Sequence, residues 1–382
     1  MPRLNQPEDT IPSHWYYDEA HYRHELDSIW YQDWVCVGHE SALACSGDYL
    51  TAEIGTQSVI VTQTDNGLRA FHNTCRHRGS QLCTKSSGRF GNGRIICPYH
   101  TWTYSLDGAL LATPGRVEGG QFDNDDYPLY QVHVDTWRGF MFVNLAESPA
   151  TSVLEQVGLE APMVDNWPLE SLRAVHQESR IIHCNWKVFW ENYSECYHCP
   201  RSHPALCKIV PLYKKATFEA ADIPGWTSAD DGGAETWSVD GSSTLPAFAS
   251  LSEEDLSRND TFVSVVGSMY LVAHRDYVRT GRLYPRGPEK MELVNDWYLS
   301  EELAKTPLDE LQPIIELPRQ VVAEDAELCE INQKGLHSMQ HKHGKLVAQE
   351  YDLREFHVWL RKRLGQDEQI DIGLNEGSAS GR

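Results

Sequence analysis

The stretch TCRHRGSQLCTKSSGRFGNGRIICPYHTW, residues 74–102, contains two short segments that each place a cysteine beside a histidine. Cys75 and His77 form the first pair, and Cys97 and His100 form the second after an interval of 19 residues. Thiolate sulfur and imidazole nitrogen bind soft and borderline transition metals. Two such pairs, on loops rich in glycine, predict one metal centre that both loops share.

The mixed pairs separate two kinds of metal centre. A Rieske [2Fe–2S] cluster needs two thiolates on one iron and two imidazoles on the other, so each loop supplies one ligand to each iron. A Cys₂His₂ zinc site uses the same residues, but classical zinc fingers pair cysteine with cysteine and histidine with histidine. We expect Cys75, His77, Cys97 and His100 to hold a Rieske cluster, with zinc as the alternative.

A second group of candidate ligands follows in NWKVFWENYSECYHCPRSHP, residues 185–204. His198 and His203 are five residues apart, so on a regular helix their side chains would diverge by about 140°. We expect the helix to deform near Pro200, so that both imidazoles can reach one ion. Two histidines and one carboxylate form the facial triad that binds ferrous iron in oxygenases.

The carboxylate of such a triad must come from another part of the chain. The acidic segment QVVAEDAELCEINQKGL, residues 320–336, offers Asp325 after an apolar lead-in. Its competitors in the same segment are Glu324, Glu327 and Glu330. The residues alone do not choose among the four. Glu195 lies three residues before His198, on the same helical face, so we expect it to accept a hydrogen bond from an imidazole.

Two cysteines beside the histidines allow other interpretations of this segment. Cys196 and Cys199 form a Cys-x-x-Cys pattern, which is typical of redox pairs in thioredoxin-like βαβ units. No such unit surrounds them, so we do not expect a redox pair. A zinc site made from these cysteines and the two histidines stays open, although it would leave Glu195 without a role.

Length and composition limit the class of protein. A chain of 382 residues is more than one ordinary core serves, so we expect about two domains. The formal charge of −22 lacks the basic footprint that nucleic acid or an anionic membrane requires. No apolar run reaches the roughly 20 residues of a membrane helix and the start shows no secretory signal, so we expect a cytoplasmic protein.

The residue pattern along the chain predicts an α+β protein. Apolar residues have helical spacing over 14–34, and short β-rich segments with glycine turns follow to about residue 145. Beyond residue 149, helical stretches alternate with strand-like ones such as 262–273, which favours an antiparallel sheet with helices. The expected parts are an N-terminal helical segment (1–34), an all-β [2Fe–2S] domain (35–148), a mononuclear iron domain (149–366) and a flexible tail (367–382).

The two metal-binding motifs, in this order, resemble those of the terminal oxygenase (α) component of Rieske non-haem iron oxygenases. The resemblance covers residues 35–340 and includes the four cluster residues, ENYSECYHCPRSHP and AEDAELCEINQKGL. It implies a helix-grip fold for the second domain, Asp325 as the ligand beside His198 and His203, and a head-to-tail homotrimer. It also implies that Glu195, where most members carry Asp, bridges the cluster of one subunit and the iron of the next.

The same resemblance implies an oxidoreductase that uses O₂ on a small organic substrate. Electrons are expected from a separate NAD(P)H-dependent flavin/iron–sulfur reductase, first to the [2Fe–2S] cluster and then to mononuclear Fe(II). The wording NWK…ENYxECYHC is similar to that of carnitine, glycine betaine and stachydrine oxygenases, which implies hydroxylation or demethylation of a quaternary ammonium compound. The alternatives are an aromatic-ring hydroxylating (di)oxygenase and, from another class, a Rieske electron carrier.

Aromatic residues could supply a binding site for a quaternary ammonium group, because ring faces attract cations. Four of them occur in or near segments that could border the iron: Trp190, Tyr193, Trp226 and Trp237. Taken singly, each is more simply read as a core or surface residue.

Overall fold

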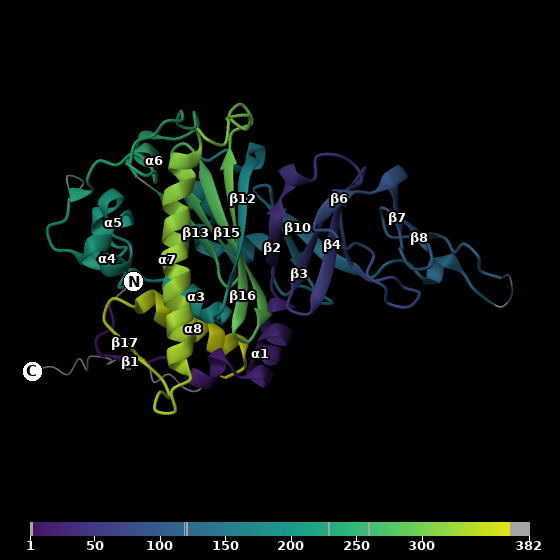
Figure 1. The fold of residues 1–382 in the computed structure, drawn as a ribbon, viewed down its shortest axis with the longest axis horizontal. Coiled ribbons are helices and arrows are strands. Elements are labelled where there is room, and N and C mark those ends of the chain that lie inside the picture. The colour runs from purple at the N-terminus through teal and green to yellow at the C-terminus, as the bar shows by residue number, and fades with distance from the viewer. Residues whose placement is uncertain (1–2, 118, 120, 228–229, 259, 367–382) are drawn as a thin grey trace, which may run out of the picture.

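The structure is a computed structural model that describes residues 3–366 except 118, 120, 228, 229 and 259. The tail expected at 367–382 lies outside the described residues. Figure 1 shows two parts side by side: an all-β part, and a part in which the long helix α7 (Gln312–Leu336) crosses a sheet. This mixture confirms the expected α+β class. None of the helices described here is long and apolar enough to span a membrane.

The all-β part contains two antiparallel sheets. A seven-stranded sheet has the order β2-β11-β10-β5-β4-β3-β6, and a three-stranded sheet has the order β7-β8-β9. The strands are β2 (Val35–His39), β3 (Asp48–Ile54), β4 (Gln57–Thr64), β5 (Gly67–His72), β6 (Ser87–Arg89), β7 (Arg94–Ile96), β8 (Thr103–Ser105), β9 (Leu110–Ala112), β10 (Gln131–Trp137) and β11 (Phe140–Asn144). The small sheet lies at the far end of the molecule (Figure 1).

The second part is built on a five-stranded antiparallel sheet of order β12-β16-β15-β14-β13. Its strands are β12 (Arg173–Ile182), β13 (Thr261–Val265), β14 (Met269–Ala273), β15 (Val278–Gly287) and β16 (Lys290–Leu299), and β1 (Glu8–Asp9) pairs separately with β17 (Lys345–Leu346). The other helices are α1 (Glu19–Glu25), α2 (Val153–Val157), α3 (Trp186–Tyr193), α4 (Cys199–Ser202), α5 (Leu206–Ile209), α6 (Glu253–Leu256) and α8 (Tyr351–Arg363). We refer to this as the α+β part.

One stretch with a strand-like sequence divides in two. Residues 262–273 form the hairpin of β13 and β14, because the chain turns at Gly267, whose φ of +80° favours glycine. The apolar pattern continues through the turn, so it does not reveal the reversal.

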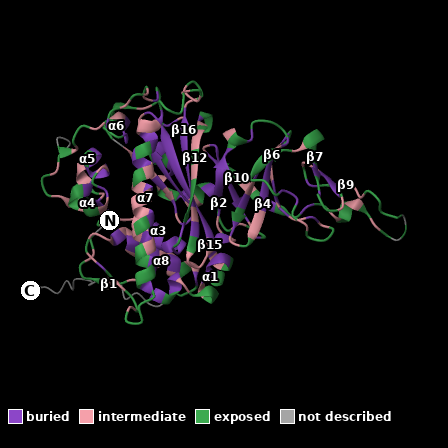
Figure 2. Ribbon diagram, in the orientation of Figure 1, coloured by how far each residue is buried: buried purple, intermediate pink, exposed green. Residues whose placement is uncertain are grey.

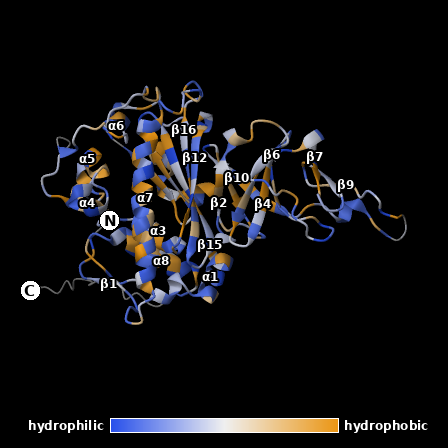
Figure 3. Ribbon diagram, in the orientation of Figure 1, coloured by the Kyte–Doolittle hydropathy of each residue, from blue (hydrophilic) through white to orange (hydrophobic). Residues whose placement is uncertain are grey.

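Both faces of the five-stranded sheet are covered. Strand β14 is buried along its whole length, and its residues alternate between a core beneath α3 and α7 and a core shared with α2 and β11. Figure 2 shows buried residues concentrated in this sheet. Helix α7 carries hydrophobic and hydrophilic residues in alternation along its length (Figure 3), with buried ones spaced mostly three or four apart.

Strand β2 joins the two parts. All five of its residues are buried, and its carbonyl groups receive side-chain hydrogen bonds from β15. Arg282 Nη1 donates to Val37 O at 3.0 Å, and the Tyr284 hydroxyl donates to Cys36 O at 2.9 Å. The guanidinium of Arg282 also pairs with Asp296, so the interface holds a compensated buried charge.

The N-terminal segment is helical, as the spacing predicts, and it packs on the α+β part. Glu25 at the end of α1 forms a buried ion pair with Lys187 of α3 and accepts a hydrogen bond from Trp186 Nε1 at 2.8 Å. Lys187 Nζ also donates to Trp15 O at 2.9 Å. Burial raises the pKa of Glu25, but Lys187 and His21 outweigh it, so the pKa lies below its ordinary value.

Candidate metal centres

The loops that carry Cys75 and Cys97 repeat one backbone arrangement. In each loop the cysteine N–H donates to the carbonyl five residues later, and the N–H four residues later returns to the cysteine carbonyl. The pairs are Cys75 N–Ser80 O and Cys97 N–Trp102 O, both 2.8 Å, with Gly79 N–Cys75 O at 3.0 Å and Thr101 N–Cys97 O at 3.1 Å. Thr101 has a left-handed φ of 56°, a costly conformation for a non-glycine residue that is typical of functional sites.

The four predicted ligands divide by depth. Cys75 and Cys97 are 2% and 1% exposed, whereas His77 is exposed and His100 is half-buried. The imidazole rings lie 4.6 Å apart between centroids. Two inner thiols and two outer imidazoles fit a binuclear cluster whose histidine-bound iron is nearer the surface. The same arrangement suits electron exchange with a docked protein.

Two aromatic residues that the sequence reasoning missed contact the predicted cluster ligands. The Tyr104 hydroxyl lies 3.2 Å from Cys75 Sγ, and the Trp102 ring stacks on His77 at 4.8 Å. Burial raises the pKa of the Cys75 thiol, and the Tyr104 hydrogen bond opposes that rise. Cys83, which lies between the two pairs in the sequence, is a buried free thiol.

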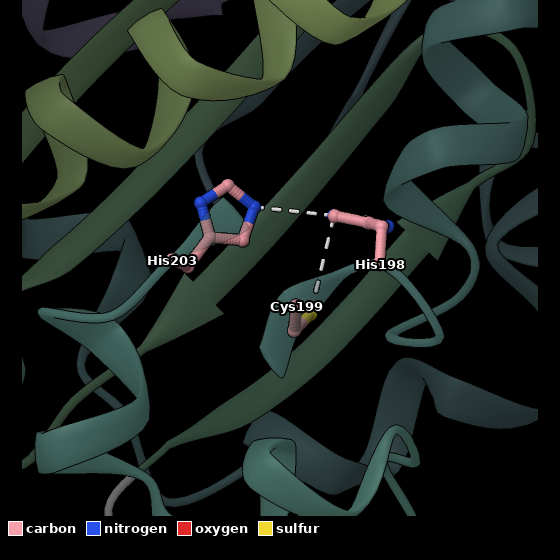
Figure 4. Close-up of side chains that lie close together, drawn as sticks. All are labelled: His198, Cys199 and His203. Atoms are coloured by element: carbon pink, nitrogen blue, oxygen red, sulfur yellow. Dashed lines mark hydrogen bonds between the residues drawn. The ribbon is translucent and has the colours of Figure 1, made fainter. Parts of the chain in front are cut away.

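Helix α3 ends earlier than the sequence predicts. It stops at Tyr193, where the Ser194 hydroxyl donates to Trp190 O at 2.7 Å, and Pro200 stands in the first turn of the separate helix α4. The break expected near Pro200 therefore begins six residues before it. Pro200 itself lies at the start of α4, a position that favours proline because its missing N–H costs nothing there. The bend turns the imidazoles of His198 and His203 toward one another (Figure 4).

Three candidate ligand atoms form a compact triangle. His198 Nε2 and His203 Nε2 are 3.1 Å apart, and Asp325 Oδ1 lies 3.3 Å from the first and 2.9 Å from the second. With metal–ligand bonds of roughly 2.1 Å, ligands at right angles would be about 3.0 Å apart. The triangle therefore matches one face of an octahedron, the arrangement of a facial triad.

The remaining nitrogen of each imidazole faces a second carboxylate. His198 Nδ1 donates to Glu195 Oε1 at 2.6 Å, and His203 Nδ1 donates to Glu324 Oε2 at 2.7 Å. These contacts hold the proton on Nδ1 in the neutral rings and leave both Nε2 lone pairs directed at the triangle. Glu324, a competitor for the ligand position in the sequence, thus contacts the far side of a ring instead.

The other two acidic competitors lie elsewhere. Glu330 Oε1 accepts a hydrogen bond from the backbone N–H of His183 at 3.0 Å. Glu327 makes no hydrogen bond or ion pair with the described residues. Of the four acids, Asp325 is the one that the structure brings beside both imidazoles.

Opposite charges stabilise this cluster in the metal-free protein. Burial lowers the pKa of His198, but Asp325 and Glu195 outweigh it and raise the pKa to about 9. Burial likewise lowers the pKa of His203, and Asp325 and Glu324 together raise it above its ordinary value. Burial raises the pKa of the half-buried Asp325, but the two imidazoles outweigh this effect and hold the pKa below its ordinary value. Positive charge is therefore favoured at this position.

The cysteines of this segment are joined. Cys196 and Cys199 form a disulfide, a pairing that the sequence analysis did not predict. Both residues are buried and close a short loop through His198, and sequence separation alone could not show this geometry. Cys199 Sγ lies 4.0 Å from His198 Nε2 (Figure 4), but in the disulfide it offers no thiolate to a metal. The alternative zinc site loses two of its four ligands in this state.

Glu195 lies at the wall of a cavity of about 390 Å³ on one side of the triangle. Its Oε2 also accepts hydrogen bonds from the backbone N–H groups of Tyr197 and His198. Asn192, which the sequence reasoning missed, has its amide nitrogen 3.4 Å from His198 Nε2. A larger cavity, about 700 Å³, is lined by His72 and other residues of the all-β part and belongs to neither cluster.

The two candidate centres are far apart within one chain. Figure 1 shows β7 and β8, which flank the second cysteine loop, at one end of the molecule and α4 and α7 at the other. Electron transfer slows steeply with distance. Direct exchange between the two centres of one chain is therefore disfavoured.

Two families match the chain. Residues 33–132 match the Rieske [2Fe-2S] domain, and residues 169–366 match the ring hydroxylating alpha subunit (catalytic domain). Among solved structures, a quaternary ammonium Rieske monooxygenase in complex with L-carnitine superposes with a TM-score of 0.72, covering 94% of this chain and 96% of the other at 23% identity. That likeness shows a shared fold.

Curated relatives carry closely related names. The glycine betaine monooxygenase oxygenase subunit of Chromohalobacter salexigens is 35% identical over 214 residues, 56% of this chain and 47% of the relative. The match therefore spans about half the length of that relative. The chloroplastic choline monooxygenase of Arabidopsis thaliana is 30% identical over 377 residues, 93% of this chain and 83% of the relative.

Proposed function

Because the chain belongs to the family of Rieske oxygenases with a ring-hydroxylating alpha-subunit catalytic domain, we propose that it is an oxygenase component acting on a small quaternary ammonium compound. The names of relatives that act on glycine betaine and choline support this substrate class. The reaction consumes one O₂, two electrons and two protons, and one oxygen atom enters the substrate while the other leaves as water. Where the attacked carbon is an N-methyl group, the hydroxylated product loses formaldehyde.

The triangle of His198, His203 and Asp325 carries this proposal. Its separations of 2.9–3.3 Å support a mononuclear Fe(II) bound to the two Nε2 atoms and Oδ1. When bound, this iron would supply the site at which O₂ is activated. Glu195 and Glu324 hold the Nδ1 protons and so orient the two rings.

The proposed cluster domain (35–148) contributes Cys75, His77, Cys97 and His100. Their support is the repeated backbone of the two loops and the division into buried thiols and outer imidazoles. When bound, a [2Fe–2S] cluster would accept and donate single electrons. In this proposal the domain receives them from a separate NAD(P)H-dependent flavin/iron–sulfur reductase.

The electron route in this proposal runs between subunits of a homotrimer. Its support is the position of the two centres at opposite ends of one chain (Figure 1). Glu195 already accepts from His198 and lies at a cavity wall, where an imidazole of a neighbouring subunit could approach. A carboxylate that accepts from both rings would give a short path between the proposed iron domain (149–366) and the neighbouring cluster.

Two measurements test the proposed function. Anaerobically purified protein should contain about three irons per chain, two in the cluster and one at the triangle. With reductase and NAD(P)H, O₂ uptake should follow addition of a quaternary ammonium compound, with formaldehyde where a methyl group is lost. Two irons and no oxygen uptake would identify an electron carrier instead. Uptake with aromatic hydrocarbons but with no ammonium compound would identify an aromatic-ring hydroxylase.

A further inference from the structure

A buried arginine in the α+β part forms no ion pair with the described residues. Arg279 of β15 is 5% exposed, and its Nε has no hydrogen-bond partner among the described residues. None of the described carboxylates forms an ion pair with its guanidinium. A buried cation outside any ion pair is costly to retain, which makes Arg279 a candidate for binding an anionic group.

Asp260, the acidic residue that interacts with Arg279, forms its hydrogen bond with another side chain. Arg279 lowers the pKa of Asp260, but the Asp260 carboxylate accepts a hydrogen bond from Trp237 Nε1 at 2.7 Å. Burial raises the pKa of Asp260 to about 6, although Trp237 and Arg279 oppose the rise. Asp260 makes no hydrogen bond or ion pair with Arg279 in the described structure, so N–H groups of the guanidinium are available to another acceptor.

Aromatic rings connect Arg279 to the candidate iron site. Its guanidinium carbon lies 5.7 Å from the ring centroids of both Trp237 and Tyr270. The Tyr270 ring stacks on Tyr193 at 4.3 Å, and Tyr193 ends helix α3 just before the histidine segment. Arg279 and Asp325 both perturb the pKa of the buried Tyr270, so this ring feels the charges of both groups.

A glycine makes room for this ring. Gly281 pairs with Tyr270 across β14 and β15, and a Cβ at Gly281 would lie 2.1 Å from Tyr270 Cζ. The ring therefore lies flat on the glycine backbone, with Tyr193 on its other side. Arg279, Tyr270 and Tyr193 therefore form one packed group that reaches the end of helix α3.

A guanidinium beside aromatic rings, next to the candidate iron site, suits a molecule that carries a positive group at one end and a negative group at the other. A quaternary ammonium group has no N–H to donate and is bound by ring faces, whereas a carboxylate is bound by a guanidinium fork. We infer that Arg279 binds the carboxylate of the substrate, which is therefore a betaine-type zwitterion and not an amino alcohol. The inference rests on the proposed function, and it places the N-methyl groups beside Tyr193, on the face of that ring that Tyr270 does not cover. Arg279 would also repel a purely cationic competitor.

Ligand binding to the anaerobic, iron-loaded protein tests this inference without turnover. Glycine betaine and L-carnitine serve as carboxylate probes, and choline carries the same trimethylammonium group without a carboxylate. Calorimetry should show tighter binding of at least one carboxylate probe than of choline. Arg279→Met should weaken that binding about tenfold to a hundredfold and leave choline unchanged or improved. Arg279→Lys should restore part of the loss.

The controls separate charge from folding. Arg275→Met removes a nearby cation that is paired with Glu235, and it should leave all three affinities unchanged. The cluster absorbance verifies folding, and if Arg279→Met does not fold, Arg279→Lys must still weaken carboxylate binding selectively. If Arg279→Met leaves all affinities unchanged, or changes those for the carboxylate probes and choline equally, the inference is overturned while the proposed function stands. Failure of the parent protein to bind any of the three probes would contradict both.

Discussion

Glu324 and Asp325, neighbours in α7, contact opposite nitrogens of one imidazole ring. Glu324 Oε2 lies 2.7 Å from His203 Nδ1, and Asp325 Oδ1 lies 2.9 Å from His203 Nε2. Successive side chains of a helix point about 100° apart, so the two adjacent carboxylates can contact opposite sides of the same ring. Glu324 orients the ring, and Asp325 lies on the side of the ring that faces the triangle of candidate ligand atoms.

Asp325→Ala should remove the mononuclear iron and leave the cluster intact. Iron should fall from about three to about two per chain, with unchanged cluster absorbance, because Asp325 is the proposed ligand. Glu324→Gln should retain the site but weaken iron binding about tenfold to a hundredfold, since it loosens His203. Glu327→Ala is the matched control and should retain three irons. If only the Glu324 variant loses iron and Asp325→Ala does not, Glu324 is the metal ligand and Asp325 is not.

Glu195→Gln should preserve both metal centres and slow the transfer of electrons between them. The amide keeps the shape but weakens the acceptor for His198 Nδ1. Rapid-mixing experiments should show a normally reduced cluster and delayed oxidation of that cluster when substrate and O₂ are present. Glu191→Gln, one turn earlier in α3, is the control for removing a nearby charge. A parental rate in the Glu195 variant would refute the bridging role.

Tyr104→Phe should lower the reduction potential of the cluster. The hydroxyl lies 3.2 Å from Cys75 Sγ, and a hydrogen bond to a ligand sulfur stabilises the reduced, more negative cluster. A redox titration followed by electron paramagnetic resonance measures the shift. Tyr49→Phe provides the comparison, because the Tyr49 hydroxyl is close to the non-ligand Cys83 and should leave the potential unchanged. Equal shifts in both variants would show that the effect is not specific to Cys75.

Glu25→Gln should destabilise the protein by about 3–5 kcal/mol, because it leaves Lys187 buried without its counter-charge. The folded-state pKa of Glu25 lies below its ordinary value of 4.5, so its contribution is present above pH 4.5 and is lost as the pH falls through the lower value. Urea unfolding at pH 7 and at pH 4 should therefore show a smaller difference between variant and parent at the lower pH. A difference that grows on acidification would contradict this sign.

The cluster residues could be predicted because their signal is local. Each cysteine lies two or three residues from its histidine, so the motif already contains the loop. The proposed ligand Asp325 could not be chosen from residues 324, 325, 327 and 330, because the choice depends on how α7 is rotated against α4. That rotation follows from burial of residues such as Val322 and Cys329 against other elements. Arg279 gave no local signal in the sequence, because its proposed role depends on the absence of an ion pair among the described residues, which only the structure reveals.

The Glu25–Lys187 pair also determines what can be cut from this protein. The iron-binding half appears in the sequence as one continuous piece from residue 149 onward, yet part of its interior comes from the stretch between Ile11 and Trp30. A fragment that starts at residue 149 would leave the Lys187 ammonium and the Trp186 ring facing an empty groove. The smallest portion that keeps this half intact is therefore discontinuous, and a hybrid that exchanges only residues 35–148 must carry both flanking pieces from the same parent.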